Sequence, residues 1–391
     1  MKKISWLILV IFVCSGINGL LFAQENISIK GCYCPRWSPT NEEIGFVGRF
    51  SKIVKIDEEE ENLVGYSIAA INQKDFSIRY ITPIAWEQNK PSAGSRYSKR
   101  SKEYEKERNI GDYNTNALTK KQSLVPILSW STIFDWSTDG TEIFFYDSPV
   151  SGIEDDMYMW AIKSDGTNLR PILKTSRDNL PSYLQCLNNG KIAIIPIRRN
   201  SFYNTLDIFN GDGKKQSQTT ISVILSSADN EGIGLSKDGK KIAIVYNKNI
   251  YIKGTSGSKA AVNLTKAEKI GECSWPSWSL DGKKIVFIFE IKFGGKINFL
   301  QHQKSVWTID ADGKNCRPLT AMAWDQNDDP IGMKARRGAT NDYCPSWSPD
   351  GNKIVFLRNS RTHEPWIMNS DGTDQIQLIN RQTVAGEIVK K

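Results

Sequence analysis

The sequence predicts an all-β protein, namely a β-propeller in which six four-stranded blades form a ring. Three observations predict this fold: one phrase recurs along the chain, a second turn-and-strand motif follows its copies, and the repeating unit is about 45 residues long. A single four-stranded sheet of this size cannot bury both of its faces. The copies are therefore expected to pack on one another, and a closed ring of blades achieves this.

The recurring phrase is clearest at three places: CPRWSPTNEEIGF at 34–46, CSWPSWSLDGKKIVF at 273–287 and CPSWSPDGNKIVF at 344–356. Weaker copies lie at 184–195 and 232–245. The six anchor positions, which are a tryptophan or its equivalent, are Trp37, Trp136, Cys186, Leu235, Trp278 and Trp347, at intervals of 99, 50, 49, 43 and 69 residues. A seventh blade inside the longest interval stays open, although residues 83–130 do not match the repeat.

Within one unit, the residue pattern predicts four short strands. The first strand ends at the tryptophan, and Asp-Gly then forms a tight hairpin because glycine tolerates positive φ. An alternating Lys-Ile-Val-Phe run predicts the second strand, and a run such as Val306–Ile309 the third. A second Asp-Gly turn, as in 164–173, 311–320 and 370–379, leads to a last strand that ends near Leu-Thr.

The phrase P-x-W-S-P-D-G-x-K-I-x-F, followed by D-G-x-x-x-x-x-L-T, resembles the TolB-type β-propeller repeat, a relative of WD-repeat blades. In TolB, the resemblance implies, a small α/β domain precedes the propeller. Here the first copy begins about ten residues after position 24, so a propeller alone is expected. Prolyl oligopeptidases also contain such blades, but nothing in this chain resembles their hydrolase domain. The repeat therefore indicates the fold strongly and the function only weakly.

Residues 1–23 have the pattern of a secretory signal peptide. Basic residues precede an apolar run over Ile4–Val13, and Ala23 provides a small residue before Gln24. A run of ten residues is too short to span a bilayer, which takes about 20 residues. We therefore expect an exported periplasmic or extracellular protein, with no membrane span, whose single propeller domain comprises residues 24–391.

Export would leave six cysteines, and an oxidising compartment would permit disulfides between them. Six cysteines allow 15 complete pairings, and the sequence does not choose among them. Buried free thiols with one bridge are the simpler interpretation. The six are Cys32, Cys34, Cys186, Cys273, Cys316 and Cys344.

Long insertions are predicted on one face of the ring only. The Asp-Gly turns of the opposite face are all tight, whereas the second–third loops and the blade-to-blade connections carry the extra residues. We expected second–third loops at 49–62, 147–156, 290–304 and 358–364. The two long blade-to-blade insertions, at 83–130 and 321–342, begin alike with Ala-Trp-acid-Gln-Asn.

These insertions supply the candidate partner-binding residues. Segment 88–122 holds nine lysines and arginines against four acidic residues, most of the chain's net charge of +8, with tyrosines between them. Such a segment suits an acidic protein partner, and export argues against nucleic acid. A solvated loop remains the alternative, as does a packing role for the two tryptophans. The candidates are Trp86, Glu87, Lys99, Arg100, Tyr104, Trp324, Asp325, Arg336 and Arg337.

Catalytic and cofactor motifs are not found in the sequence. There is no CxxCH, G-x-S-x-G, P-loop or HExxH pattern, so we expect no catalytic residue, no metal and no cofactor. The only two histidines, His302 and His363, are weak metal candidates on neighbouring blades, with Asp325 or Glu364 as a third ligand.

The predicted function is a non-catalytic scaffold that binds a protein partner through its long-loop face. One alternative is a cofactor-free subunit of a secreted redox complex, since the multihaem enzyme hydrazine synthase has a propeller subunit similar in kind. Another is a small-ligand binder or enzyme that uses the mouth of the central channel.

Overall fold

The computed structural model describes most of the chain between residues 27 and 379. The residues not described within this span are 57–58, 85–86, 89–125, 127, 148–156, 176–178, 199–203, 222–231, 257–259, 267–270, 294–300, 321–340 and 359–362. The predicted signal peptide, 1–23, lies outside the described residues.

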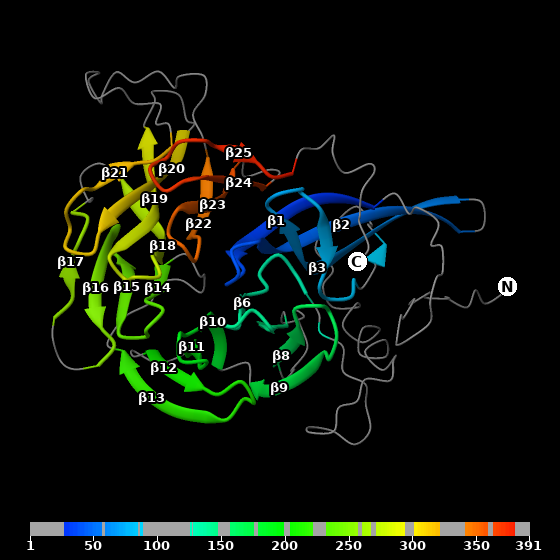
Figure 1. The fold of residues 1–391 in the computed structure, drawn as a ribbon, viewed down its shortest axis with the longest axis horizontal. Coiled ribbons are helices and arrows are strands. Elements are labelled where there is room, and N and C mark those ends of the chain that lie inside the picture. Colours follow the sequence, from blue (N-terminus) through cyan, green and yellow to red (C-terminus); the bar gives the residue numbers. More distant parts are fainter. Residues whose placement is uncertain are drawn as a thin grey trace.

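The described strands form six antiparallel sheets arranged as a ring (Figure 1). Each sheet uses strands that are consecutive in the sequence, and this confirms the predicted six-bladed propeller.

Blade 1 contains β1 (Ile27–Trp37), β2 (Glu43–Ile56), β3 (Glu59–Asn72), β4 (Ile78–Tyr80) and the added β5 (Glu87–Gln88). Blade 2 contains β6 (Phe134–Trp136), β7 (Glu142–Tyr146), β8 (Met157–Lys163) and β9 (Arg170–Thr175). Blade 3 contains β10 (Asn179–Cys186), β11 (Ile192–Arg198), β12 (Asn204–Phe209) and β13 (Lys215–Ile221). Blade 4 contains β14 (Ile233–Leu235), β15 (Lys241–Tyr246), β16 (Asn249–Gly254) and β17 (Val262–Asn263). Blade 5 contains β18 (Glu272–Trp278), β19 (Lys284–Phe293), β20 (Gln301–Asp310) and β21 (Arg317–Pro318). Blade 6 contains β22 (Asp342–Trp347), β23 (Lys353–Arg358), β24 (Glu364–Asn369) and β25 (Ile376–Gln377).

The anchor residue of each repeat packs against the preceding blade. Trp136 of blade 2 lies in one apolar cluster with Val47 and Ile68 of blade 1. The degenerate anchors obey the same rule, since Cys186 packs with blade 2 and Leu235 with blade 3. Six apolar clusters thus fill the six seams between neighbouring blades. The recurring tryptophan is a seam residue, which explains why the phrase recurs once per blade.

Hydrogen bonds explain the remainder of the phrase, Ser-x-Asp-Gly-x-Lys. In blade 5, the Ser279 hydroxyl donates to Asp281 Oδ1 at 2.6 Å and accepts from the backbone N–H of Lys284 at 2.9 Å. Asp281 Oδ1 also accepts from the backbone N–H of Lys283 at 3.0 Å. These contacts lower the pKa of the Asp281 carboxyl, and the hydrogen bond from Ser279 is the largest cause. Gly282 closes the turn at a φ of +66°.

Two of the predicted second–third loops are wrong. Segment 49–62 is almost entirely strand: β2 and β3 pair continuously from Glu43↔Asn72 to Ile56↔Glu59. Segment 290–304 likewise extends β19 and β20, whose pairing reaches Phe293↔Gln301. Isoleucine and phenylalanine residues in both segments favour extended backbone, so the ladder of the blade continues through them instead of ending in a loop. The sequence also has an acidic run at 57–61, and within it Glu60 of β3 pairs with Lys55 of β2.

Among the described strands, none is exchanged between the first and last blades to close the ring. Blade 1 and blade 6 are each complete in themselves, so their seam is joined by side chains and isolated backbone contacts. Trp37 and Phe46 pack there against Val355 and Leu357. Across the same seam, Asn41 Nδ2 donates to Asp350 Oδ2 at 2.9 Å.

In the part of the chain that the structure describes, no helix has the length and apolar character needed to cross a membrane.

Candidate functional site: the central channel

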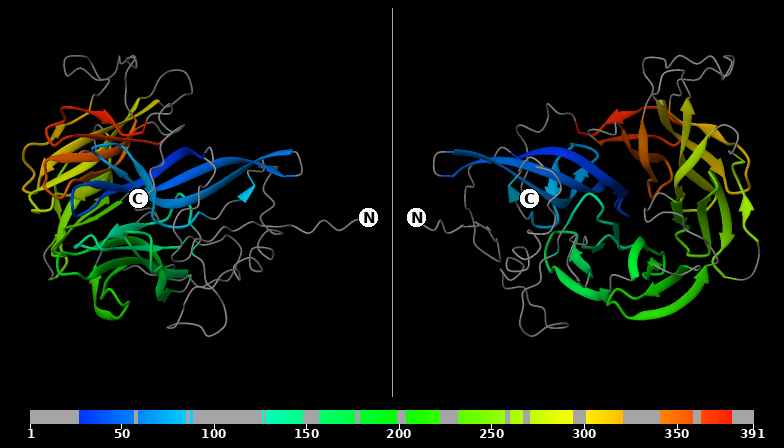
Figure 2. Two further views of the ribbon diagram at one scale, coloured as in Figure 1. Left: turned by 45° about the vertical axis from the view of Figure 1, so that its right-hand side comes forward. Right: turned by 180° about the vertical axis from the view of Figure 1, so that it is seen from behind.

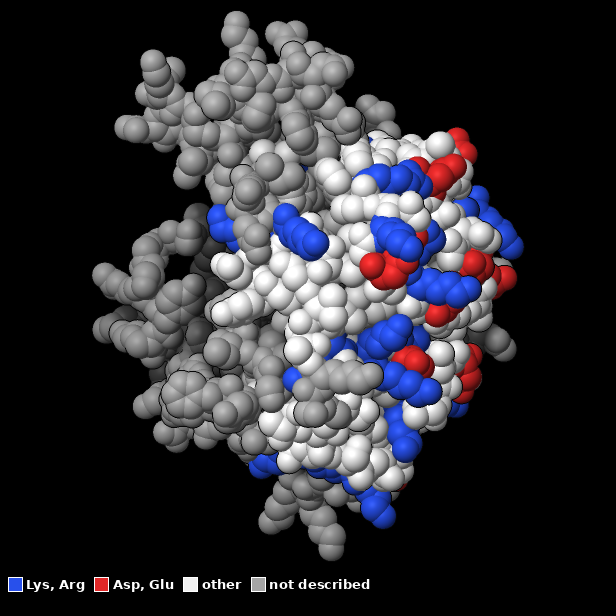
Figure 3. All heavy atoms as spheres, turned by 90° about the vertical axis from the view of Figure 1, so that its left-hand side faces the viewer, with Lys and Arg blue, Asp and Glu red and all other residues white. Residues whose placement is uncertain are grey.

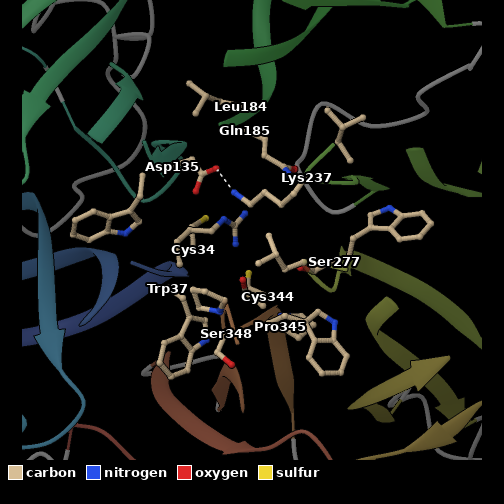
Figure 4. A pocket seen from close by; sticks show the side chains of 18 of the residues that line it. Cys34, Trp37, Asp135, Leu184, Gln185, Lys237, Ser277, Cys344, Pro345 and Ser348 are labelled. Carbon is tan, nitrogen blue, oxygen red and sulfur yellow. Dashed lines mark hydrogen bonds and ion pairs between the residues drawn. The ribbon is translucent and has the colours of Figure 1, made fainter. Parts of the chain in front are cut away.

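The innermost strands of all six blades surround a pocket of about 260 Å³ on the axis of the ring (Figure 4). Because side chains alternate along a strand, the residue before each anchor faces the channel while the anchor faces the seam. These positions line the pocket in five blades: Arg36, Asp135, Gln185, Ser277 and Ser346. A second tier, two residues after each anchor, lines it in all six blades: Pro39, Thr138, Asn188, Lys237, Leu280 and Pro349. The second tier belongs to the first–second turns, so the pocket lies toward the tight-turn end of the channel.

The sixth member of the first tier is Gly234, and the packing requires a glycine there. A Cβ atom at this position would lie 2.2 Å from the backbone oxygen of Pro276 on blade 5. The carbonyl oxygen of Gly234 also accepts a hydrogen bond of 3.0 Å from the indole N–H of Trp278. At this position the backbone of blade 4 packs directly against blade 5, so blade 4 contributes no first-tier side chain to the channel.

An ion pair connects blade 2 to blade 4 across blade 3. Lys237 Nζ lies 3.1 Å from Asp135 Oδ2, and the two side chains face each other in the pocket (Figure 4). Asp135 Oδ2 also accepts from the backbone N–H of Cys186 at 2.9 Å, and Lys237 donates to the Cys186 carbonyl oxygen at 3.1 Å. The Asp135 side chain is only 7% exposed, so its charge depends on these two donors.

Tyr183 holds the wall between blades 3 and 4. Its hydroxyl donates to Gln185 Oε1 and accepts from the backbone N–H of Leu235 at 3.0 Å. Burial raises the pKa of Tyr183 to about 12, so the hydroxyl stays protonated and can serve as both donor and acceptor.

Arg36 gives the pocket an excess of positive charge. The charged residues that line the pocket are Arg36, Asp135 and Lys237. Asp135 is engaged by Lys237, whereas the described contact of Arg36 is a hydrogen bond of 3.1 Å from Nη1 to the carbonyl oxygen of Pro35. The guanidinium group is half-buried and lies where an anion could approach it.

A bulge turns three equivalent residues into the channel. Cys34, Trp275 and Cys344 each precede a proline in the repeat and have φ values of 49°, 48° and 48°. The strand register shifts at all three places, next to Tyr33, Ser274 and Tyr343. All three residues line the pocket, and the side chains of Cys34 and Cys344 form a hydrogen bond with each other. Figure 4 shows both sulfur atoms within the pocket.

His363 packs in the seam between blades 6 and 1. Its ring centroid is 4.8 Å from that of Tyr33 and 6.3 Å from that of Tyr343. Burial lowers the pKa of His363, which favours the neutral imidazole. The other histidine, His302, lies in β20 opposite Lys292. Among the described residues, no three histidine, cysteine or acidic side chains are grouped so as to hold a metal ion.

Most of the predicted partner-binding residues lie outside the described residues. This applies to Trp86, Lys99, Arg100, Tyr104, Trp324, Asp325, Arg336 and Arg337. Glu87 is placed: it belongs to β5, where it pairs with Val64 on β3 of blade 1. The first long insertion therefore begins along the edge of the extended β2–β3 hairpin.

The β2–β3 hairpin projects beyond the ring as an arm (Figures 1 and 2). In the described residues, the arm comprises 53–56 of β2 and 59–62 of β3, since the pairing of β1 with β2 ends at Lys52. Ile53, at the base of the arm, is 64% exposed.

Charges of both signs are mixed on the side of the ring that carries β16, β17 and β21 (Figure 3). Lysines there pair with neighbouring aspartates, as in Lys284 with Asp310 at 2.8 Å. Such a face attracts neither strongly acidic nor strongly basic partners. The positive excess of the chain has to come from other segments, and 88–122 is the richest of these in the sequence.

Sequence reasoning did not identify the channel residues. The sites were predicted in the insertions of the long-loop face, whereas the pocket lies toward the opposite end of the channel, where the first–second turns are. A signal did exist: the residue before the anchor is polar in five of the six copies, although the strand that carries it is otherwise expected to be buried. Strand alternation would have placed these residues on the channel wall.

No protein-family model matches the chain, and no curated protein matches it. Solved structures do. A protein described as TolB from Agrobacterium tumefaciens is 16% identical, with a TM-score of 0.32 over 90% of this chain and 81% of that one. A puromycin-hydrolysing peptidase from Mycobacterium tuberculosis is 12% identical, with a TM-score of 0.45 over 93% of this chain but 55% of that one. An oligogalacturonate lyase from Vibrio parahaemolyticus is 9% identical, with a TM-score of 0.40 over 87% and 90%. At these identities the matches do not assign an activity to the chain.

Proposed function

We propose that the chain is an exported, non-catalytic propeller that binds a protein partner through blade 1. The observation that carries this proposal is the arm, in which two paired strands project past the ring. At the base of the arm, β5 pairs with Leu63 and Val64 of β3, so the first insertion begins beside the arm. The rigid seams of the ring would hold this arm in a fixed direction. The net positive charge of 88–122 favours an acidic partner surface.

Shortening the arm tests this proposal. Lys52 and Leu63 face each other in the ladder, so an Asn-Gly turn can replace residues 53–62 without disturbing the blade. We expect the shortened protein to melt like the wild type and to lose its co-purifying partner. A matched control shortens the other extended hairpin by joining Ile291 to Gln303 with the same turn. Retention of the partner by the arm-shortened protein would contradict the proposal.

Export is the second part of the proposal, and its support is the sequence of residues 1–23. Expression of the full-length chain in a bacterial host, followed by fractionation and N-terminal sequencing, tests it directly. We expect the mature protein to begin at Gln24. A protein that keeps Met1 and stays in the cytoplasm would contradict export. If the partner that co-purifies contains haem, the chain would act as the cofactor-free subunit of a redox complex.

A second candidate function is the binding of a small anion in the channel, and the observation that favours it is Arg36 in the pocket. The pocket volume suits a ligand of a few heavy atoms, such as phosphate or a short dicarboxylate. Calorimetric titration with phosphate and with malate tests this function. Binding should be lost in Arg36→Gln and kept in Lys283→Gln, whose side chain is 80% exposed on a turn. Equal affinity in both variants would contradict a channel site.

A further inference from the structure

The seam between blade 1 and blade 6 is where the ring depends most on weak contacts. All other seams join blades that follow each other in the chain, whereas this seam joins the first blade to the last. Besides its apolar cluster, it is held by Asn41 with Asp350, by Lys353 Nζ donating to Gln73 Oε1 at 3.0 Å, and by the backbone N–H of Cys32 donating to the carbonyl oxygen of His363 at 3.3 Å. A covalent link at this seam would have the largest effect on the stability of the ring.

Two thiols meet at this place on equivalent positions of the repeat. Cys34 ends the bulge of β1 in blade 1, and Cys344 ends the same bulge of β22 in blade 6. The left-handed backbone of both residues turns their side chains into the channel, where both line the same pocket (Figure 4). The remaining bulge of this kind, in blade 5, carries Trp275. Blades 1 and 6, which meet at the closing seam, are thus the blades with cysteine at this bulge position.

We propose that Cys34 and Cys344 form a disulfide that closes the propeller ring covalently. The thiolate of Cys34 attacks one sulfur of an oxidising disulfide, such as oxidised glutathione or a disulfide-donor protein, and releases its first thiol. The thiolate of Cys344 then attacks the sulfur of Cys34 and displaces the second thiol. The two cysteines together lose two electrons, which reduce the oxidising disulfide to two thiols. These two thiols take up the two protons that Cys34 and Cys344 release.

The other cysteines are less suited to this reaction. Burial raises the pKa of the Cys32, Cys186, Cys273 and Cys316 thiols, so the thiolate fraction of each is small near neutral pH. For Cys34 the opposite holds: the hydrogen bond from Cys344 is the largest cause of a pKa lowered to about 7, and Arg36 contributes in the same direction. Exchange chemistry is therefore directed to the channel pair.

The bond would connect residues that are 310 positions apart in the sequence. Closing so long a loop restricts the unfolded chain strongly, so oxidation should stabilise the protein more than most disulfides do. Oxidation also removes two thiols from the pocket wall and fixes the distance between its blade 1 and blade 6 sides. Neither the arm nor the anion site is needed for this proposal.

Equilibration of the purified full-length protein with oxidised glutathione tests the clasp. Remaining thiols are blocked with N-ethylmaleimide, and the protein is digested and analysed by mass spectrometry without reduction. We expect a linked pair of peptides that contain Cys34 and Cys344. The melting temperature of the oxidised protein should exceed that of the reduced protein by about 5 °C or more.

Each variant is compared with its own reduced form, so that a folding defect cannot imitate the result. The increase in melting temperature on oxidation should vanish in Cys34→Ser and in Cys344→Ser. It should persist in Cys316→Ser, which removes the most exposed thiol of the described chain. The proposal is overturned if both channel thiols are still alkylated after oxidation, if the linked peptides contain other cysteines, or if oxidation leaves the melting temperature unchanged.

Discussion

Individual residues in the channel have two separate tasks, which are to hold blades together and to define a chemical surface. Asp135 shows the first task, because one carboxylate receives a backbone N–H from blade 3 and an ammonium group from blade 4. Arg36 shows the second, because its charge is directed at the pocket. Substitutions at these two positions should therefore be distinguishable by stability measurements.

We expect Asp135→Ala to destabilise the protein by about 3 kcal/mol, since it leaves the buried N–H of Cys186 and the ammonium of Lys237 without their acceptor. Lys237→Met should cost less, about 1–2 kcal/mol, because its side chain is 30% exposed and Asp135 keeps the Cys186 donor. Urea unfolding of both variants and of the double variant measures these costs. A larger loss for Lys237→Met than for Asp135→Ala would show that the assignment of roles is reversed.

The lowered pKa of Cys34 predicts the pH dependence of its alkylation. The thiolate is the reactive form, so the rate with iodoacetamide should rise as the pH increases and reach half of its maximum near pH 7. In Cys344→Ala the hydrogen bond is lost, so the pKa of Cys34 rises and the curve should move to higher pH. Mass spectrometry of the Cys34 peptide in the reduced protein measures both curves. An unchanged curve in the variant would remove the proposed role of Cys344.

Among the structural elements, the tight turns that contain glycine show how the repeat contributes to assembly. The first–second turns border the channel, whereas the third–fourth turns lie against the preceding blade. At Gly213 of blade 3, an added Cβ would lie 2.1 Å from the backbone oxygen of Ile172 in blade 2. At Gly190, a first–second turn with a φ of +73°, nothing lies within 4 Å of the added Cβ.

Gly190→Ala and Gly213→Ala therefore separate backbone strain from steric overlap. Both place an L-residue at positive φ, which costs about 1–2 kcal/mol. Gly213→Ala also forces blade 3 away from blade 2, so we expect its loss to reach about 3 kcal/mol or more. Thermal and urea denaturation of the pair provide the comparison. Equal losses would mean that the third–fourth turn can move away from its neighbour at little cost.

The elements were predictable to the extent that local pattern determines them. The first–second Asp-Gly turns of blades 2, 4, 5 and 6, the anchor positions and the second strands follow from short-range rules, and the structure shows the four-stranded pattern in all six blades. The strand extensions at 49–56 and 290–293 were mistaken for loops because nothing in their local pattern marks where a blade ends. The pocket was missed for another reason: its residues come from six blades, and only closure of the ring brings Cys34 of blade 1 and Cys344 of blade 6 to one pocket.

For the molecule as a whole, closure of the ring distinguishes the blade 1–blade 6 seam from the other five. Loss of packing in an ordinary seam leaves the two blades joined by the chain on one side. Loss of packing in the closing seam leaves blades 1 and 6 connected only through the other four blades, so the ring can open there. Trp37 and Trp347 make this comparison possible, since they are equivalent anchors, 6% and 7% exposed, in the closing seam and in the neighbouring blade 5–blade 6 seam.

We expect Trp37→Ala and Trp347→Ala to cost similar free energies of unfolding, about 3–5 kcal/mol, because each removes a buried indole ring. Their effects on local opening should differ. Hydrogen exchange followed by mass spectrometry on the reduced proteins should show faster exchange in β1 and β22–β24 of Trp37→Ala, because the first and last blades separate as units. In Trp347→Ala, the increase should stay within the blade 5–blade 6 seam. Identical exchange patterns would mean that the closing seam opens no more readily than the others, and a covalent clasp there would then have little to stabilise.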